Sequence, residues 1–143
     1  MAGKTARDIM SPDAECIGEN DSVMDAAKRL AELDVGSMPI CGEDDRLKGM
    51  LTDRDIVVKV LAQDKDPSSV RAGELGVGDG KTVTIGADDP IEDALRTMID
   101  HKVRRLPVID GHQLVGIISQ ADIATNLDEE RVGDLVEAIS AAP

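Results

Sequence analysis

Apolar residues recur along the chain in two patterns, one with the period of a helix and one typical of short strands. From Val23 to Leu30 they occupy the i, i+3, i+4 and i+7 positions of one helix face. Two apolar runs follow at 38–41 and 47–51, and the turn-rich sequence CGEDDR separates them. This order predicts an amphipathic helix followed by a β-hairpin.

The same order of patterns occurs a second time later in the chain. A shift of 68 positions places Pro39 on Pro107, and after a one-residue contraction in the loop a shift of 67 places Asp55 on Asp122. A repeat of this kind indicates that one supersecondary unit is present twice. We therefore interpret the chain as two copies of a single unit.

Each copy is predicted to begin with a strand and to end with a second helix. The strands are expected around 16–18 and 83–85, and the second helices at 53–61 and 120–127. The predicted fold class is α+β, with tandem β-α-β-β-α repeats and a three-stranded sheet in each. Because a domain of about 60 residues is only marginally stable alone, we expect the copies to pack as an intramolecular pseudo-twofold unit.

The sequence also suggests how the chain is divided. The first motif is predicted to span 6–66, the second 67–128, and a helical tail 129–143, in which apolar residues have a helical period from 129 to 140. The polar segment 62–75 contains a proline and is predicted to be a connecting loop.

Composition excludes several classes of function. The chain has 16 basic and 29 acidic residues and a formal net charge of −13, whereas nucleic-acid-binding proteins need a basic surface to contact phosphates. No apolar run approaches the roughly 20 residues that span a bilayer, and the first ten residues lack the apolar stretch of a signal peptide. We expect a cytoplasmic protein that binds neither nucleic acid nor membrane.

The residues that point to chemistry lie where each hairpin meets the following helix. The tetrads TDRD at 52–55 and SQAD at 119–122 both fit the pattern [ST]-x-x-D. One interpretation is a helix cap, in which the hydroxyl and the carboxylate satisfy free backbone N–H groups. The other is a nucleotide site, in which the carboxylate accepts hydrogen bonds from ribose hydroxyls near a phosphate. Two tetrads at matching places of a repeat favour the nucleotide site.

Around these tetrads the sequence resembles the CBS-domain pair, also called the Bateman module, over about residues 6–127. The most diagnostic segments are DIM at 8–10, GSMPI at 36–40, LKGMLTDRDIV at 47–57, RRLPVID at 104–110 and LVGIISQADI at 114–123. The resemblance implies a non-enzymatic regulatory module that binds an adenosine-type nucleotide in a cleft between the two motifs. It leaves AMP, ADP, ATP, S-adenosylmethionine and NAD open as ligands.

The resemblance also implies specific contacts and partners. The hydroxyls of Thr52 and Ser119 would contact phosphate or ribose, and Asp55 and Asp122 would hold the ribose diol. A module without an effector domain in its own chain would signal through an unknown protein effector or through a change of oligomeric state. The resemblance further implies a homodimer.

Basic residues distinguish the two copies. Arg104 and Arg105 stand where the first copy has Gly36 and Ser37. Arg105 is the first choice for a phosphate contact and Arg104 the second, because a guanidinium group binds phosphate with two hydrogen bonds. Arg54 is the corresponding choice in the first copy. The alternative for all three arginines is an ordinary salt bridge to surface carboxylates.

The two cysteines, Cys16 and Cys41, fall on neighbouring predicted strands of the first copy. They are interpreted either as a disulfide or redox-sensitive pair or as two buried thiols, and the thiols are favoured because cytoplasmic disulfides are uncommon. The disulfide would suit an alternative function, a ligand-free stress-response interaction protein under redox control.

Metal and catalytic sites are not predicted. His101 and His112 form no metal-binding spacing with the cysteines. The sequence also has no nucleophile elbow and no phosphate-binding loop of the Walker type. We therefore expect a protein that is not an enzyme and needs no cofactor.

Overall fold

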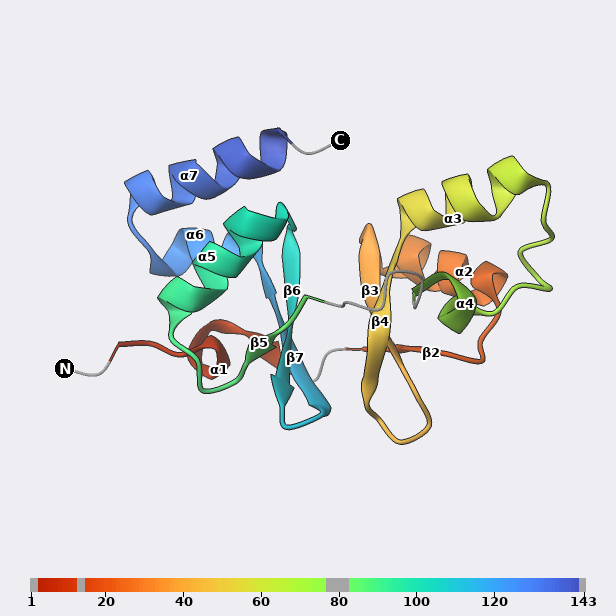
Figure 1. Cartoon of the computed structure of the whole chain (residues 1–143), viewed down its shortest axis with the longest axis horizontal. Coiled ribbons are helices and arrows are strands. Elements are labelled where there is room, and N and C mark those ends of the chain that lie inside the picture. The colour runs from red at the N-terminus through yellow and green to blue at the C-terminus, as the bar shows by residue number, and fades with distance from the viewer. Residues whose placement is uncertain (1–2, 13–14, 77–82, 142–143) are drawn as a thin grey trace. The chain divides into compact units, whose positions relative to one another are not determined.

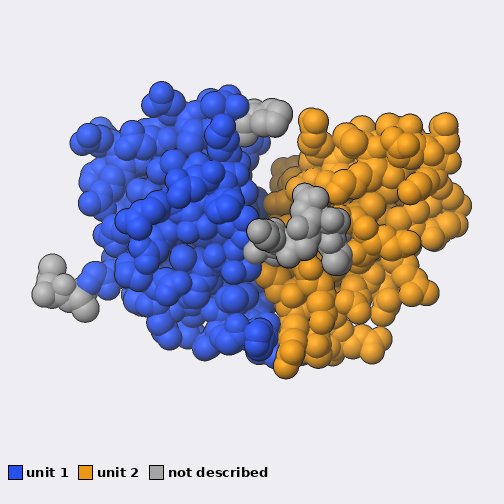
Figure 2. Space-filling model, in the orientation of Figure 1, with its two compact units in different colours: residues 1–14, 83–143 blue, residues 15–82 orange. Residues whose placement is uncertain are grey.

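The computed structural model describes residues 3–12, 15–76 and 83–141. These residues form two compact units (Figure 2). Each unit has its own hydrophobic core. Unit 2 contains residues 15–76, and unit 1 combines residues 3–12 with residues 83–141. Unit 1 is therefore assembled from both ends of the chain.

Unit 2 contains the first copy of the repeat (Figure 1). Its elements are β2 (Ile17–Gly18), α2 (Val23–Leu33), β3 (Ser37–Cys41), β4 (Leu47–Thr52), α3 (Asp53–Lys59), the 3-10 helix η1 (Leu61–Gln63) and α4 (Ala72–Gly76). Strand β2 lies parallel to β3, and β3 pairs with β4 as an antiparallel hairpin. The strand order β2-β3-β4 gives the predicted three-stranded sheet.

Unit 1 contains the second copy. Its elements are α1 (Ala6–Ile9), β1 (Ser11–Pro12), β5 (Ile85–Gly86), α5 (Ile91–His101), β6 (Arg105–Asp110), β7 (Gln113–Ser119), α6 (Gln120–Asn126) and α7 (Glu129–Ser140). The order β-α-β-β-α from β5 to α6 repeats the order from β2 to α3, so the predicted α+β fold with tandem repeats is confirmed. The tail helix also lies where the apolar period predicts it.

The amphipathic helices form as their sequence pattern predicts. Helices α2 and α5 are both 11 residues long, and each buries its apolar side. Each ends at a residue in the left-handed region, Asp34 with φ 54° and Lys102 with φ 55°. A left-handed residue stops a helix because it turns the chain away from the helix axis. The two copies therefore share their helix ends as well as their helix faces.

Unit 1 differs from the prediction because its sheet has a fourth strand. Strand β1 pairs antiparallel with β7, with Ser11 opposite Ile117, and the strand order is β1-β7-β6-β5. The backbones approach closely here, since a Cβ atom on Gly116 would lie 2.7 Å from the carbonyl oxygen of Ser11. Glycine at this position allows the added strand to pair.

The prediction of a loop at 62–75 holds for its middle but is wrong at both ends, because η1 extends into its start and α4 occupies its end. Helix α4 has a counterpart in α1. The N–H of Ala72 donates to the carbonyl of Asp21 at 2.8 Å, and the N–H of Ala6 donates to the carbonyl of Asp89 at 2.9 Å. Each short helix is thus tied to the strand-to-helix turn of its own unit. Both are too short to show a helical period in the sequence.

A carboxylate caps each of these two short helices. The N–H of Thr5 donates to Asp8 at 2.8 Å, and the N–H of Arg71 donates to Glu74 at 2.7 Å. The bond from Thr5 lowers the pKa of the Asp8 carboxyl, because it stabilises the charged form. The caps compensate in part for the small apolar surface that such short helices bury.

Aliphatic side chains and methionine fill both cores, as the absence of aromatic residues requires. In unit 2 the fully buried side chains include Ile40 and Leu51 from the hairpin, and in unit 1 they include Val108 and Ile118 from the matching positions. Alternate residues of β4 and β7 point into these cores and leave their neighbours at the surface. This alternation sets which side chains are available at the strand ends.

Candidate functional site

Both predicted tetrads lie at a strand-to-helix junction and form helix caps. In unit 2 the N–H of Asp55 donates to the Thr52 hydroxyl oxygen at 3.0 Å, and the N–H of Thr52 donates to Oδ2 of Asp55 at 3.1 Å. In unit 1 the same pair of bonds joins Ser119 and Asp122, at 3.3 and 2.7 Å. All four residues are partly buried. The capping interpretation is therefore correct at both junctions.

Capping leaves part of the Asp122 carboxylate available. Both bonds from Ser119, from its N–H and from its hydroxyl, go to Oδ2 of Asp122. Among the described residues, Oδ1 of Asp122 has neither a hydrogen bond nor an ion pair. In unit 2, Oδ1 of Asp55 lies 3.5 Å from Nζ of Lys59. A cap and a ligand contact are thus compatible, most clearly at Asp122.

The hairpin of unit 1 brings two arginines to its junction. Arg105 lies directly opposite Ser119 in the β6–β7 register. The carbonyl of Arg104 accepts the N–H of Gln120, the first residue of α6, at 3.0 Å. The predicted residues Arg104, Arg105, Ser119 and Asp122 therefore lie around one junction. All of them belong to the same unit.

Unit 2 has the same backbone arrangement with different side chains. Ser37 lies opposite Thr52 in the β3–β4 register, and the carbonyl of Gly36 accepts the N–H of Asp53 at 2.9 Å. The positions that hold arginines in unit 1 hold serine and glycine here. The basic residue predicted for this copy, Arg54, is exposed in the first turn of α3.

The salt-bridge alternative for the three arginines finds no support. Within residues 3–12, 15–76 and 83–141, every ion pair involves other cations, and none involves Arg54, Arg104 or Arg105. Arg104 and Arg54 are exposed, and Arg105 is half-buried.

The two cysteines are joined by a disulfide in unit 2. Their Cα atoms are 5.7 Å apart, within the range that a disulfide spans. The bond connects Cys16, just before β2, to Cys41, the last residue of β3. The interpretation as two separate buried thiols therefore does not hold in this structure.

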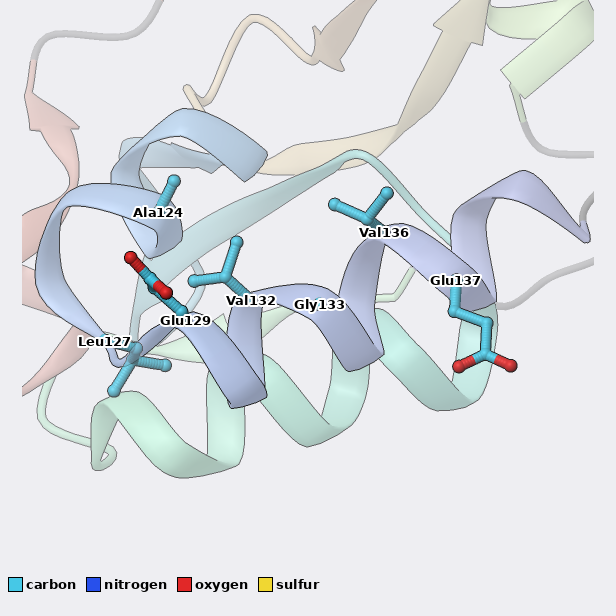
Figure 3. Close-up of a pocket in the computed structure, with 7 residues that line it drawn as sticks. All are labelled: Ala124, Leu127, Glu129, Val132, Gly133, Val136 and Glu137. Atoms are coloured by element: carbon cyan, nitrogen blue, oxygen red, sulfur yellow. The ribbon is translucent and has the colours of Figure 1, made fainter.

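An open apolar groove of about 470 Å³ lies on unit 1 where α6 meets α7 (Figure 3). It is lined by Ala124, Leu127, Glu129, Val132, Gly133, Val136 and Glu137. None of the predicted ligand residues lines it. The groove depends on the way α7 packs beside α6, and the sequence pattern contains no signal for that packing.

The described residues bring together no group of three or more His, Cys, Asp or Glu side chains that could hold a metal ion. His101 is the last residue of α5, and His112 lies in the turn between β6 and β7. In the described part of the chain, no helix is long and apolar enough to cross a membrane.

Comparison with known proteins identifies the family. The model of the CBS domain matches residues 6–62 and 78–129. The chain belongs to the CBS-domain family. Each match contains one copy of the repeat, and the family resemblance inferred from the sequence motifs is confirmed.

Three relatives place the chain within the family. It is 48% identical to hypoxic response protein 1 of Mycobacterium tuberculosis over 135 residues, which cover 94% of this chain and 93% of that protein. A crystal structure of hypoxic response protein I with two coordinated zinc ions is 49% identical, has a TM-score of 0.80, and covers 87% of this chain and 100% of that one.

The two other relatives were crystallised with adenosine compounds. CBSX2 in complex with AMP has a TM-score of 0.73 and 26% identity, and covers 86% of this chain and 95% of that one. The CBS-domain pair of MJ0100 in complex with 5′-methylthioadenosine and S-adenosylmethionine has a TM-score of 0.72 and 29% identity. The match covers 87% of this chain and 95% of that one. CBS-domain pairs similar to this chain therefore bind adenosine ligands.

Proposed function

We propose that this protein is a non-catalytic regulatory module that binds an adenosine nucleotide. The observation that carries this proposal is the junction of unit 1. Two arginines that form no ion pair with any described residue lie there with a carboxylate that has one oxygen uncommitted among the same residues. Arginine and carboxylate are the groups that recognise the phosphate and the ribose diol of a nucleotide. Binding of AMP by CBSX2, and of 5′-methylthioadenosine and S-adenosylmethionine by MJ0100, supports the assignment.

The roles of the residues in unit 1 follow from their bonds. Oδ1 of Asp122 accepts hydrogen bonds from the ribose hydroxyls, while Oδ2 stays bonded to Ser119. Ser119 therefore holds the carboxylate in position. Arg105, opposite Ser119, contacts the phosphate, and Arg104 adds a second positive charge.

Unit 2 supplies a second, weaker set of contacts. Asp55 takes the role of Asp122, Thr52 holds it through the same cap, and Arg54 is the basic residue of this set. Lys59 lies beside Asp55 and competes with a ligand for its free oxygen. We therefore propose that unit 1 binds the nucleotide more tightly.

Ligand binding regulates by shifting an equilibrium between states that bind the nucleotide differently. A ligand that binds only the folded protein also stabilises it, by about 2.7 kcal/mol when its concentration is 100 times Kd. The output passes through a protein effector or a change of oligomeric state. Neither requires chemistry within the chain.

Calorimetry of the purified protein tests the proposal. AMP, ADP, ATP, S-adenosylmethionine and NAD are titrated separately, and cytidine monophosphate is the control for binding that depends only on phosphate. We expect saturable heat from at least one adenosine compound and none from cytidine monophosphate. A folded protein that gives no saturable heat with any of the five compounds would contradict the proposal.

We also propose that the protein is a homodimer and that α3 and η1 contribute to the contact. Val57, Val58 and Leu61 are 55%, 44% and 51% exposed there, and adjacent exposed apolar side chains are typical of protein contact surfaces. A symmetric dimer would cover the same surface on both copies.

Light scattering tests the dimer. The wild type is expected at twice the chain mass of 15.2 kDa. Val57→Asp places a charge in the contact and should shift the protein to the monomer, whereas Gln113→Asp, an exposed change in the other unit, should not. A monomeric wild type, or an unchanged mass in Val57→Asp, would exclude this contact.

The disulfide favours one alternative function, an interaction protein of the stress response that binds no nucleotide and is governed by the redox state of Cys16 and Cys41. The calorimetric titration separates the two functions when it is repeated with reductant. Nucleotide binding in either redox state supports the nucleotide module. Partner binding that changes with reductant and is insensitive to nucleotide supports the alternative.

A further inference from the structure

The two junctions have one backbone arrangement but differ in the charges of their matched side chains. In both units the first residue of the helix after the hairpin donates its N–H to the carbonyl of the residue immediately before the hairpin's first strand. This residue is Gly36 in unit 2, at 2.9 Å, and Arg104 in unit 1, at 3.0 Å. In both, the hydroxyl residue lies opposite the next residue of that strand. Differences in ligand preference must therefore come from the side chains.

Six positions match between the junctions. In unit 1 they hold two arginines and one carboxylate, whereas in unit 2 they hold one arginine and two carboxylates. The matched positions are Gly36, Ser37 and 52–55 in unit 2, and Arg104, Arg105 and 119–122 in unit 1. The formal charge of these six positions is thus positive in unit 1 and negative in unit 2, where Lys59, outside the six, pairs with Asp55.

The additional carboxylate of unit 2 lies where unit 1 has an arginine. A Cβ atom on Gly36 would be 3.4 Å from Oδ2 of Asp53. The Asp53 carboxylate therefore lies beside the backbone position at which the matching junction has Arg104. At the position of Asp53, unit 1 has the uncharged Gln120. A phosphate that Arg104 and Arg105 attract would be repelled by Asp53.

We propose that the two junctions select adenosine compounds by the charge of the group on the 5′ carbon. The junction of unit 1 takes a compound with a 5′-phosphate. The junction of unit 2 takes one whose 5′ group has no negative charge, such as a thioether or a sulfonium. This inference rests on the proposed function and assigns a ligand class to each of its sites. Like-charge repulsion keeps a phosphate out of unit 2, and opposite charge attracts it to unit 1. A positive sulfonium has the reverse preference, and an uncharged thioether is not repelled by Asp53.

Exchange of the matched residues tests the assignment. One variant carries Arg104→Gly, Arg105→Ser and Gln120→Asp, and the reciprocal variant carries Gly36→Arg, Ser37→Arg and Asp53→Gln. AMP and 5′-methylthioadenosine are titrated into each variant and into the wild type at low and high salt. The control is Arg96→Ser, which removes an exposed arginine elsewhere in unit 1.

The wild type is expected to bind one AMP per chain, more weakly at high salt because salt screens charges. The first variant should lose at least about tenfold in AMP affinity, since hydrogen bonds to a charged group are lost, and should keep its affinity for 5′-methylthioadenosine. The reciprocal variant should gain a second AMP per chain, and Arg96→Ser should match the wild type.

Gln120→Asp alone is the least disruptive version, because it changes one polar side chain at the start of α6. It should lower AMP affinity severalfold at low salt and less at high salt.

Unchanged AMP binding in folded Gln120→Asp and in the triple variant would overturn the assignment. If both compounds bind to both junctions without preference, the assignment fails and the proposed function stands. If neither compound nor any other adenosine ligand binds the wild type, the proposed function itself fails.

Discussion

Replacing both cysteines, as Cys16→Ala with Cys41→Ala, is expected to lower the free energy of unfolding of unit 2 by about 3–4 kcal/mol. The disulfide closes a loop with a sequence separation of 25, and the loss of chain entropy in the unfolded state accounts for an effect of this size. The bond also holds β2, which pairs with β3 through only two residues. Without it, unit 2 relies on that short pairing and on its aliphatic core.

Urea unfolding followed by circular dichroism measures this effect. Wild-type protein in reductant is the matched control, because reduction breaks the bond without removing a side chain. Its unfolding midpoint should move toward that of the double variant, and reductant should leave the variant unchanged. Identical midpoints for oxidised and reduced wild type would show that the bond does not stabilise unit 2.

Amide hydrogen exchange shows which part of the chain loses stability when the disulfide is reduced. The amides of β3, and the N–H of Gly73 that donates to the carbonyl of Glu19, should exchange faster after reduction. The amides of β6 and β7 should not, because unit 1 has no disulfide and a separate core. Faster exchange in both units would mean that they unfold together.

Asp122→Asn is expected to weaken AMP binding roughly 10- to 150-fold, the equivalent of about 1.5–3 kcal/mol for hydrogen bonds to a charged group. The asparagine oxygen can still accept the N–H of Ser119, so the helix cap remains. What is lost is the negative charge that receives the ribose hydroxyls. Calorimetry at constant salt measures the change.

Two comparisons make this result specific. Asp100→Asn removes an exposed carboxylate elsewhere in unit 1 and should leave AMP binding unchanged. Asp55→Asn makes the same substitution in unit 2 and should weaken the ligand bound there, with little effect on AMP in unit 1. AMP affinity that survives in Asp122→Asn would exclude this carboxylate as the ribose contact.

Elements with enough residues to show a period could be predicted from the sequence. Apolar residues with a helical period predict α2, α5 and α7, and the pairs of short apolar runs predict both hairpins. Helices α1 and α4 and strand β1 could not be predicted in this way, since they are two to five residues long and lie outside the repeated β-α-β-β-α order. Their positions depend on hydrogen bonds to turns distant in sequence, such as that from Ala6 to Asp89.

The candidate site likewise has features that the local sequence predicts and features that depend on the tertiary structure. The [ST]-x-x-D pattern locates both junctions, because a capping box is a local interaction. Within the part of the chain that the structure describes, one oxygen of Asp122 is uncommitted and Arg104 and Arg105 form no ion pair. Both features depend on the surrounding structure and leave no trace in the sequence. The register that places Arg105 opposite Ser119 follows from the hairpin turn, and counting back from that turn could have found it.

Titration of the isotope-labelled protein with AMP, followed by amide chemical shifts, tests most directly whether the junction of unit 1 is a nucleotide site. The account predicts saturable shifts at Arg105, Ser119 and Asp122. Shifts confined to the groove between α6 and α7, or no shifts at any AMP concentration, would contradict it.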